Sequence, residues 1–343
     1  MVLPLNKQRI LVFAPSFFGY EKEIVNKLKE LGAIVDFYDT RYTETTLGKA
    51  IMRIQKNLIT NIINRHYKKI LLEIENKEYD VLLFFRADPA PRWFNESLNK
   101  KYPNAQKVLY IWDSVVVYPT HIEDIDLYDE VFSHDPVDCK QHNLKLRPLF
   151  YRDDYLVQNN ITPNSYEYDF SFVGAARKDR YLMLENLKVG ADKKKQRYFI
   201  FYYLHSELSY LFFKYISRDF PKSKKSDFAF SPLNHEEIQK VMASSKVVVD
   251  VHHPKQAGLT MRTIEFLASK KKFVTTNKEI LKYDFFNENN IGILNRENPE
   301  IEAEFLNSEY QNISGDILER YSLGYFLLEI LGKVPCGDYY DLK

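Results

Sequence analysis

Short apolar runs alternate with amphipathic stretches along the whole chain. Residues 9–15 (RILVFAP) are a continuous apolar run, which is typical of a buried strand. Residues 21–32 carry apolar side chains at helical spacing and end at Gly32, and residues 33–39 form the next apolar run. A strand, a helix and a strand at this spacing predict a parallel sheet with right-handed crossovers.

The same alternation restarts after residues 159–167, which are rich in Asn, Ser and Pro and predict a linker. We therefore expect two α/β halves in tandem, with domains at residues 1–158 and 168–315. Ligands of such sheets bind at the carboxyl ends of the strands, and in a two-domain chain the cleft between the domains is the expected site. Further strands are expected at 81–88, 107–113, 130–135, 168–174, 197–204, 246–253, 272–277 and 291–295, and helices at 46–76, 178–187, 206–217, 234–245, 259–270 and 300–332.

The amino-acid composition excludes several classes of function. The 343 residues suggest two domains at roughly 150 residues each. Lys and Arg number 48 against 47 Asp and Glu, so the chain lacks the basic excess of nucleic-acid binders, and no nucleic-acid partner is expected. Cys139 and Cys336 make neither a disulfide framework nor a metal cluster, which favours a reducing cytoplasm. The sequence predicts no signal peptide and no membrane-spanning helix.

Two common nucleotide-binding motifs are missing. No G-x-G-x-x-G follows any predicted strand, and no Walker A sequence occurs. NAD-dependent enzymes and P-loop NTPases are therefore not expected.

The segment 246–277 carries the strongest chemical signal. A predicted strand leads to a helix that begins near Gly258 and Thr260, and the free N–H groups of a helix N-terminus favour phosphate. Arg262 supplies a forked cation for a diphosphate. Glu265 lies three residues on, on the same helix face, and can accept hydrogen bonds from a ribose. The simpler interpretation is that Arg262 and Glu265 pair with each other.

A second signal is the stretch SFVGAARKDR (171–180), in which a strand ends at a glycine and a basic loop follows. A small residue lets the backbone approach a ligand, and cations can neutralise a departing diphosphate. The alternative is a solvated loop that binds nothing. The residues predicted to bind the donor nucleotide are Gly174, Arg177, Lys178, Arg180, His252, Gly258, Thr260, Arg262 and Glu265.

The motifs SFVG and MRTIEFLASKKKFVTTN together resemble the C-terminal domain of GT-B glycosyltransferases, closest to the CgeB-like and the capsule or lipopolysaccharide enzymes grouped with families 1 and 4. YIWDSV, VFSHDPVD and RPLFY extend the resemblance into the first half, over residues 80–330. It implies two Rossmann-like domains whose parallel sheets face each other across a cleft. It also implies a C-terminal helix, within residues 316–343, that crosses back to the first domain.

The resemblance implies a nucleotide-sugar donor site in the second domain and an acceptor site in the first. Glu265 matches the glutamate that holds the donor ribose, and Arg177 and Arg262 match positions near the diphosphate. Family 4 enzymes have an earlier glutamate in the preceding loop, whereas the window around Ala257 and Gly258 has no acid. The retaining or inverting outcome therefore stays open.

An inverting enzyme needs a general base near the acceptor hydroxyl. Candidates follow the strands of the first half: Asp113, His121, His134 and Asp135. The alternatives are a turn or capping role for Asp113 and a structural role for His134.

A metal role is not expected. Asp124 and Asp126 spell D-x-D, the pair with which GT-A enzymes hold a divalent cation, but they lie in an acidic run where the motif arises by chance. GT-B enzymes work without an obligatory metal, so no cofactor is expected beyond the UDP-, GDP- or other nucleotide-sugar substrate.

The stretch 49–69 mixes basic and apolar residues and predicts either a helix on an anionic membrane or a surface helix packed on the core. Lys222, Lys224 and Lys225 add a basic loop. The expectation is a cytoplasmic glycosyltransferase, free or peripheral at the inner membrane, that adds sugar to a glycan or lipid-linked acceptor of lipopolysaccharide or capsule. The alternatives are a non-hydrolysing nucleotide-sugar epimerase and a nucleotide-sugar-binding protein without activity.

Overall fold

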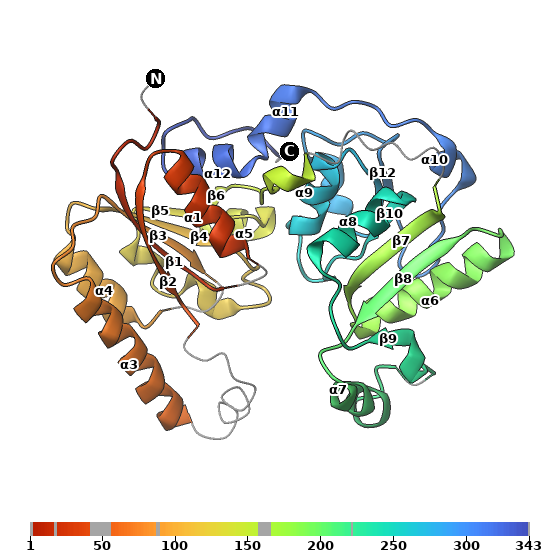
Figure 1. Ribbon diagram of the computed structural model, residues 1–343, viewed down its shortest axis with the longest axis horizontal. Helices are drawn as coiled ribbons and strands as arrows, with labels where there is room; N and C mark the ends of the chain where they lie inside the picture. The colour runs from red at the N-terminus through yellow and green to blue at the C-terminus, as the bar shows by residue number, and fades with distance from the viewer. Residues whose placement is uncertain are drawn as a thin grey trace. The chain divides into compact units, whose positions relative to one another are not determined.

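The computed structural model describes residues 3–16, 19–41, 56–86, 90–156, 166–220 and 222–341 (Figure 1). The chain divides into two compact units. The first contains residues 1–150, 255–258 and 319–340, and the second contains residues 151–254, 259–318 and 341–343. Each unit is built on its own sheet.

The first unit contains a six-stranded sheet in the order β2-β1-β3-β4-β5-β6, and every neighbouring pair is parallel. β3 is buried at all six positions, as expected for a parallel strand covered on both faces. The strands are β1 (Arg9–Ala14), β2 (Ile34–Asp39), β3 (Val81–Arg86), β4 (Gln106–Ile111), β5 (Glu130–Ser133) and β6 (Lys145–Leu146), and the α-helices are α1 (Tyr20–Glu30), α3 (Lys56–Glu73), α4 (Arg92–Lys101), α5 (Pro136–His142) and α12 (Leu323–Ile330).

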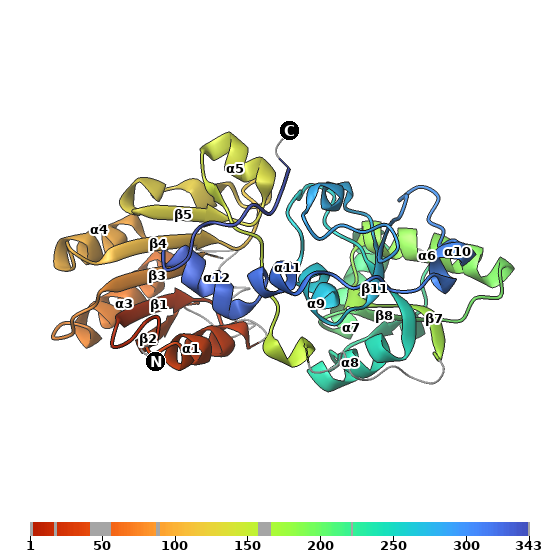
Figure 2. The same ribbon diagram turned by 90° about the horizontal axis from the view of Figure 1, so that it is seen from above.

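Aromatic side chains fill both faces of this sheet. Phe13 stacks on Phe84 at 4.7 Å between ring centroids, and Phe94 of α4 meets the same face edge-on. On the opposite face Phe326 of α12 contacts Tyr110 at 4.8 Å. The sheet is thus sandwiched between α3 and α4 on one side and α1 and α12 on the other (Figure 2).

The second unit contains another six-stranded parallel sheet, in the order β12-β11-β10-β7-β8-β9. The α/β fold class expected from the sequence is therefore confirmed. The strands are β7 (Tyr168–Ala175), β8 (Tyr198–Tyr203), β9 (Phe228–Ala229), β10 (Ser245–Asp250), β11 (Lys272–Thr275) and β12 (Ile291–Ile293), and the α-helices are α6 (Lys178–Lys193), α7 (Glu207–Leu211), α8 (His235–Ala243), α9 (Met261–Ala268) and α10 (Ala303–Asn307). Along the chain, the boundary between the second unit and the C-terminal part of the first falls within α11 (Gly315–Arg320).

Strand order fixes where each sheet can bind a ligand. In the second sheet the chain winds outward from β7 through β8 to β9 and, in the other direction, from β10 through β11 to β12. The direction of winding reverses between β7 and β10, and a crevice opens at the carboxyl ends of the two strands at such a point. In the first sheet the reversal lies between β1 and β3.

Two expected helices differ in the structure. The stretch expected as one helix over 206–217 is α7 followed by a π-helical turn at Phe212–Ile216. The expected C-terminal helix is two short helices, α11 and α12, because the chain breaks at Tyr321 and Ser322 and Ser322 caps the second helix. None of the described helices is long and apolar enough to cross a membrane.

A buried ion pair holds the C-terminal segment in the first unit. The guanidinium of Arg147 lies 2.9 Å from the carboxylate of Glu329, and neither side chain has any exposed surface. Arg147 also donates to the carbonyl of Arg320 at 2.7 Å and lies over the rings of Phe326 and Tyr339. The segment is therefore an integral part of this unit.

Candidate functional site

The reversal point of the second sheet brings two predicted residues together. Arg177 follows β7 and His252 follows β10, and the Arg177 guanidinium donates to the His252 carbonyl at 3.2 Å. Arg177 also pairs with Asp179 at 2.9 Å, and its side chain is 31% exposed. A partly exposed guanidinium at this edge of the sheet is suited to bind an anion.

A second arginine, Arg296, follows β12 and joins these side chains. Arg296 donates to the His252 carbonyl at 2.6 Å, to Thr276 Oγ1 at 3.0 Å and to Asp179 at 3.1 Å. Asp179 thus pairs with both arginines, and the three side chains together keep a net positive charge. Burial raises the pKa of Asp179, but the two arginines together outweigh burial and hold it below its usual value. Arg177, Arg296, Asp179, His252 and Thr276 are referred to below as the arginine cluster.

His252 is neutral in this arrangement. Its Nδ1 lies 2.7 Å from Thr276 Oγ1 and 3.2 Å from an Arg296 nitrogen. Because a guanidinium can only donate, Nδ1 must be unprotonated to accept from it. Burial first, and then the charges of Arg296 and Arg177, lower the pKa of His252 to about 4.

The two other predicted cations of this segment, Arg180 and Lys178, lie at the start of α6 in different surroundings. Arg180 donates to the carbonyls of Ala175 and Val251 at 2.8 and 2.7 Å and lies over the ring of Phe172. Lys178 is exposed and lies 3.6 Å from Asp219. Arg180 therefore ties β10 to the start of α6, and its guanidinium is already occupied.

Gly174 lies close to two side chains of its own unit. A Cβ at this position would lie 2.8 Å from the ring of Phe172 and 3.2 Å from a nitrogen of Arg180. The glycine therefore makes room for the stacked Phe172 and Arg180 side chains, and contact of its backbone with a ligand stays a prediction.

Helix α9 begins where the sequence predicted, and its N-terminus is supported by the buried carboxylate of Asp250, whereas phosphate binding there stays a prediction. Thr260 caps the helix, accepting from the Thr263 N–H at 3.2 Å, and its hydroxyl lies 3.4 Å from Asp250. Thr275 and Thr263 donate to the other Asp250 oxygen at 2.8 and 3.3 Å. Burial raises the pKa of Asp250, against the effect of these hydroxyls and of Arg180.

The simpler interpretation of Arg262 and Glu265 matches the geometry. The two side chains lie 3.6 Å apart, and Glu265 is only 2% exposed. Burial and the hydrogen bond to Glu265 raise the pKa of the Tyr155 hydroxyl, so this glutamate also holds a buried tyrosine. Contact with a ribose stays a prediction for Glu265.

In the first unit, Asp135 organises a loop. Its carboxylate caps α5 through the Val137 N–H at 2.9 Å and accepts from the N–H groups of Ala257 and Gly258 at 3.0 and 3.1 Å. A Cβ on Gly258 would lie 2.5 Å from the ring of His134, so this glycine is packed against a histidine. His134 is 4% exposed.

The remaining base candidates differ in access. His121 is fully buried, and its Nδ1 lies 3.2 Å from the carbonyl of Asp113. The side chain of Asp113 is half-buried. Of the four candidates, Asp113 is therefore the one most able to meet a substrate.

The D-x-D pair does not converge on a metal site. Asp124 is buried and pairs with Arg86 at 3.1 Å, whereas Asp126 is exposed and pairs with Arg92 at 2.7 Å. Among the residues that the structure describes, no three His, Cys, Asp or Glu side chains are grouped to hold a metal ion.

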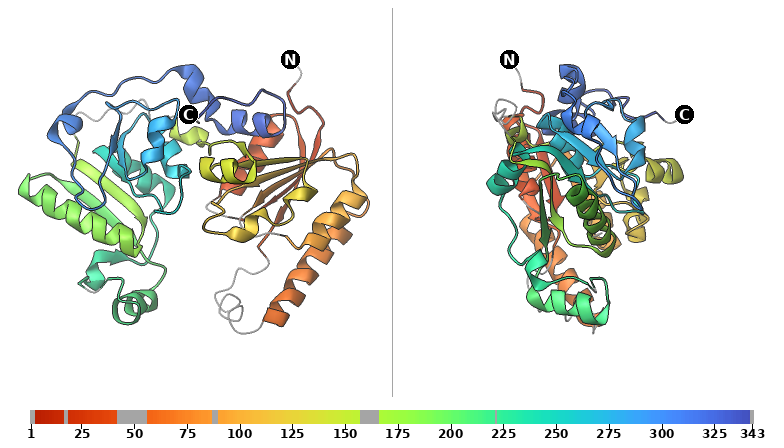
Figure 3. Two further views of the ribbon diagram at one scale, coloured as in Figure 1. Left: turned by 180° about the vertical axis from the view of Figure 1, so that it is seen from behind. Right: turned by 90° about the vertical axis from the view of Figure 1, so that its right-hand side faces the viewer.

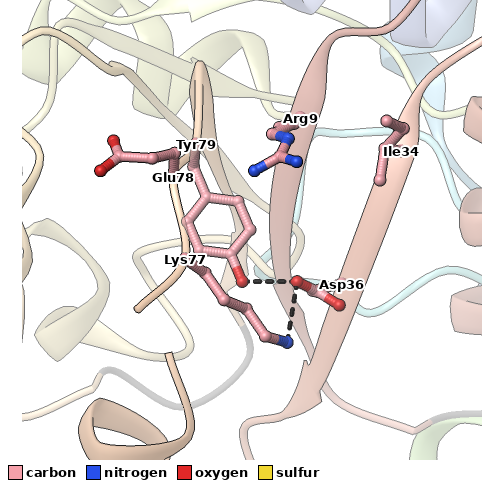
Figure 4. Close-up of a pocket in the computed structure, with 6 residues that line it drawn as sticks. All are labelled: Arg9, Ile34, Asp36, Lys77, Glu78 and Tyr79. Carbon is pink, nitrogen blue, oxygen red and sulfur yellow. Dashed lines mark hydrogen bonds and ion pairs between the residues drawn. The ribbon is translucent and has the colours of Figure 1, made fainter. Parts of the chain in front are cut away.

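A small polar pocket lies at the opposite, amino-terminal edge of the first sheet. It has a volume of about 220 Å³, and Asp36 accepts there from the Tyr79 hydroxyl at 2.6 Å and from Lys77 at 3.1 Å (Figure 4). Arg9 lines the same pocket. Because parallel sheets bind ligands at their carboxyl ends, this pocket is not where the fold predicts a substrate.

Comparisons with known proteins fit this architecture. No protein-family model matches the chain, and no curated protein matches it in sequence. A solved glycosyltransferase from Rickettsia africae is similar in structure, with a TM-score of 0.60 and 15% identity, covering 95% of this chain and 97% of that one. The chain has the GT-B fold.

Two further GT-B structures are similar over nearly their whole length. The lipopolysaccharide outer core galactosyltransferase WaaB has a TM-score of 0.53 and 10% identity, covering 95% of this chain and 100% of that one. The UDP-GlcNAc 2-epimerase from Neisseria meningitidis, solved with UDP-GlcNAc, has a TM-score of 0.54 and 13% identity over the same shares. The GT-B fold is thus common to a transferase and an epimerase.

Arg296, Thr276 and Asp250 were not predicted from the sequence. Each lies at or just after the carboxyl end of a strand of the second sheet, β12, β11 and β10 respectively. This is the same signal that identified Arg177 and His252, so applying it to every predicted strand would have found the three residues.

Proposed function

We propose that this protein transfers a sugar from a nucleotide-sugar donor to a glycan or lipid-linked acceptor during the synthesis of a bacterial surface polysaccharide such as lipopolysaccharide or capsule. The observation that carries the proposal is the arginine cluster at the reversal point of the second sheet. Arg177 and Arg296 keep 31% and 27% of their side chains exposed. They are placed where a GT-B sheet can receive a nucleotide.

The chemistry requires such cations. An acceptor hydroxyl attacks the anomeric carbon while the bond to the nucleoside diphosphate breaks, and negative charge develops on the departing diphosphate. Fixed guanidinium groups stabilise that charge. In this proposal the diphosphate replaces Asp179 as the partner of Arg177 and Arg296. Arg262 and the N-terminus of α9 contact the diphosphate beside these two arginines, and Glu265 holds the ribose.

On the acceptor side we propose Asp113 as the general base. Its half-buried carboxylate can take the proton from the acceptor hydroxyl if the reaction inverts. His134 and Asp135 belong to the supporting structure of the same unit.

The first experiment is a calorimetric titration with UDP, GDP, CMP and ADP, with and without EDTA. For the nucleotide that binds, Arg177→Ala and Arg296→Ala are each expected to weaken binding by about 10- to 100-fold, the loss of a charge-assisted hydrogen bond. The matched control is Lys193→Ala at the far end of α6, which should bind as the parent protein does. Unchanged affinity in both arginine variants would remove the donor-site assignment.

Activity assays then distinguish a glycosyltransferase from an epimerase. The shared fold with the Neisseria epimerase makes epimerisation the second candidate. Conversion of a nucleotide sugar without any acceptor would favour the epimerase, and turnover that requires a saccharide acceptor would favour the transferase. Nucleotide binding without either reaction would identify a binding protein.

A further inference from the structure

One helical segment of the second unit turns a complete apolar stripe toward solvent. It consists of α7 and the π-helical turn that continues it, Glu207 to Ile216, and stands beyond β9 at the edge of this unit (Figures 1 and 3). The spacing of the exposed side chains, three and four residues apart, puts them on one face. They are Leu208, Leu211, Phe212, Tyr215 and Ile216, with exposed fractions of 78, 47, 48, 65 and 71%.

The opposite face fixes the segment to the unit. Tyr210 is 4% exposed and packs on Phe228, and Phe213 packs on Phe220, both in the core of the second unit. The stripe therefore cannot turn inward without taking these aromatic side chains out of the core. Its exposure is a property of the folded unit.

Basic side chains border the stripe. Residues 207–227 contain five Lys and Arg against three Asp and Glu. Lys222 and Lys224 are exposed in the loop after the helix, and Lys214 ties that loop to the helix by donating to the Ser223 carbonyl at 2.8 Å. An apolar face with aromatic residues and a basic border is the pattern of a helix that lies in a membrane surface.

We propose that this segment, the 207–216 stripe with the Lys222 and Lys224 loop, docks the protein on an anionic lipid bilayer. A stable protein interface uses about 20–30 residues a side, whereas the stripe offers five, and a bilayer accepts a narrow wedge of this kind. Contact with a bilayer would bring the protein to a lipid-linked acceptor. This purpose rests on the proposed function, whereas the docking surface itself does not. The stretch of basic and apolar residues at 49–69 is not used for this inference, because residues 42–55 lie outside the described part of the chain.

The test is flotation of the full-length protein with vesicles of neutral phosphatidylcholine alone or with a third of phosphatidylglycerol. The protein is expected to float with the anionic vesicles and to be released by high salt. Phe212→Ser with Ile216→Ser, and separately Lys222→Glu with Lys224→Glu, are each expected to lower the bound fraction by about tenfold or more. Matched controls on α6 are Val189→Ser, 56% exposed, and Lys193→Glu, which should float like the parent protein.

Each outcome decides the proposal. Equal flotation of the parent protein and both double variants, or no flotation of the parent protein, would overturn it. A dimer in light scattering that Phe212→Ser with Ile216→Ser converts to a monomer would replace the bilayer by a second copy of the chain. Vesicles carry no nucleotide or acceptor, so failure here leaves the transferase proposal standing, and calorimetry of the same variants shows whether the donor site is intact.

Discussion

His252 connects charge and fold within the arginine cluster. Its carbonyl accepts from Arg177 and Arg296, and its ring accepts at Nδ1, so both the backbone and the side chain of one residue hold the two cations in place. This works only while the imidazole is neutral. Burial and the two neighbouring guanidinium groups disfavour a charged ring, so the pKa of His252 falls to about 4.

The depressed pKa predicts how stability changes with pH. An unfolded histidine titrates near 6.5, so between about pH 6.5 and 4 the unfolded chain binds a proton that the native protein does not. Stability is therefore lost as the pH falls through this window, by on the order of 2–3 kcal/mol from this group. His252→Asn keeps an acceptor but does not titrate, so its urea midpoint should fall less between pH 7 and 4.5. Parallel pH profiles for the two proteins would contradict the prediction.

Two arginines after β7 show that the sequence predicts where a side chain lies along the chain but not which way it points. Arg177 and Arg180 stand three positions apart after the same strand, and the sequence predicted a ligand role for both. Arg180 is turned inward onto two carbonyls, and this depends on Phe172 and Gly174, which leave room for its guanidinium. The position of the loop followed from strand periodicity, whereas the direction of each arginine depends on packing across the sheet.

At the scale of elements, the cap of α9 couples the helix to β10. Thr260 accepts from the Thr263 N–H and shares its hydroxyl with the buried Asp250 carboxylate. Thr260→Ala removes both bonds and is expected to cost about 0.5–2 kcal/mol of stability. Thr260→Ser keeps the hydroxyl and is the matched control. Chemical denaturation of the three proteins checks this, and equal midpoints for Ala and Ser would show that the cap contributes nothing.

Strands were predicted more reliably than helix ends because a parallel strand is a short run that is apolar on both faces, as in β3 and β10. The segment at 206–217 shows the limit. Its apolar periodicity predicted a helix, but periodicity does not say which face is buried. The structure buries Tyr210 and half-buries Phe213, while it exposes Leu208 and Ile216. Facing depends on contacts with distant residues such as Phe220 and Phe228.

At the scale of the whole molecule, each of the two units is built from segments that are not consecutive in the sequence. The segment 319–340 is the end of the chain, yet it completes the first unit, and residues 259–318 before it complete the second. The mutual placement of the two sheets across a cleft stays a prediction. Because Arg147 and Glu329 are both without exposed surface, the contact that closes the first unit is a buried ion pair.

Glu329→Gln tests whether this closure is independent of the donor site. The substitution leaves the Arg147 charge buried without its counter-ion, which is expected to cost about 3–5 kcal/mol. Glu319→Gln, an exposed change in the same segment, is the matched control. The arginine cluster belongs wholly to the second unit. Glu329→Gln should therefore leave the affinity for the nucleotide unchanged, while the unfolding transition of the first unit moves to a lower denaturant concentration. Loss of nucleotide affinity together with stability would instead mean that the first unit shapes the donor site, and the site would then have to be assigned to both units.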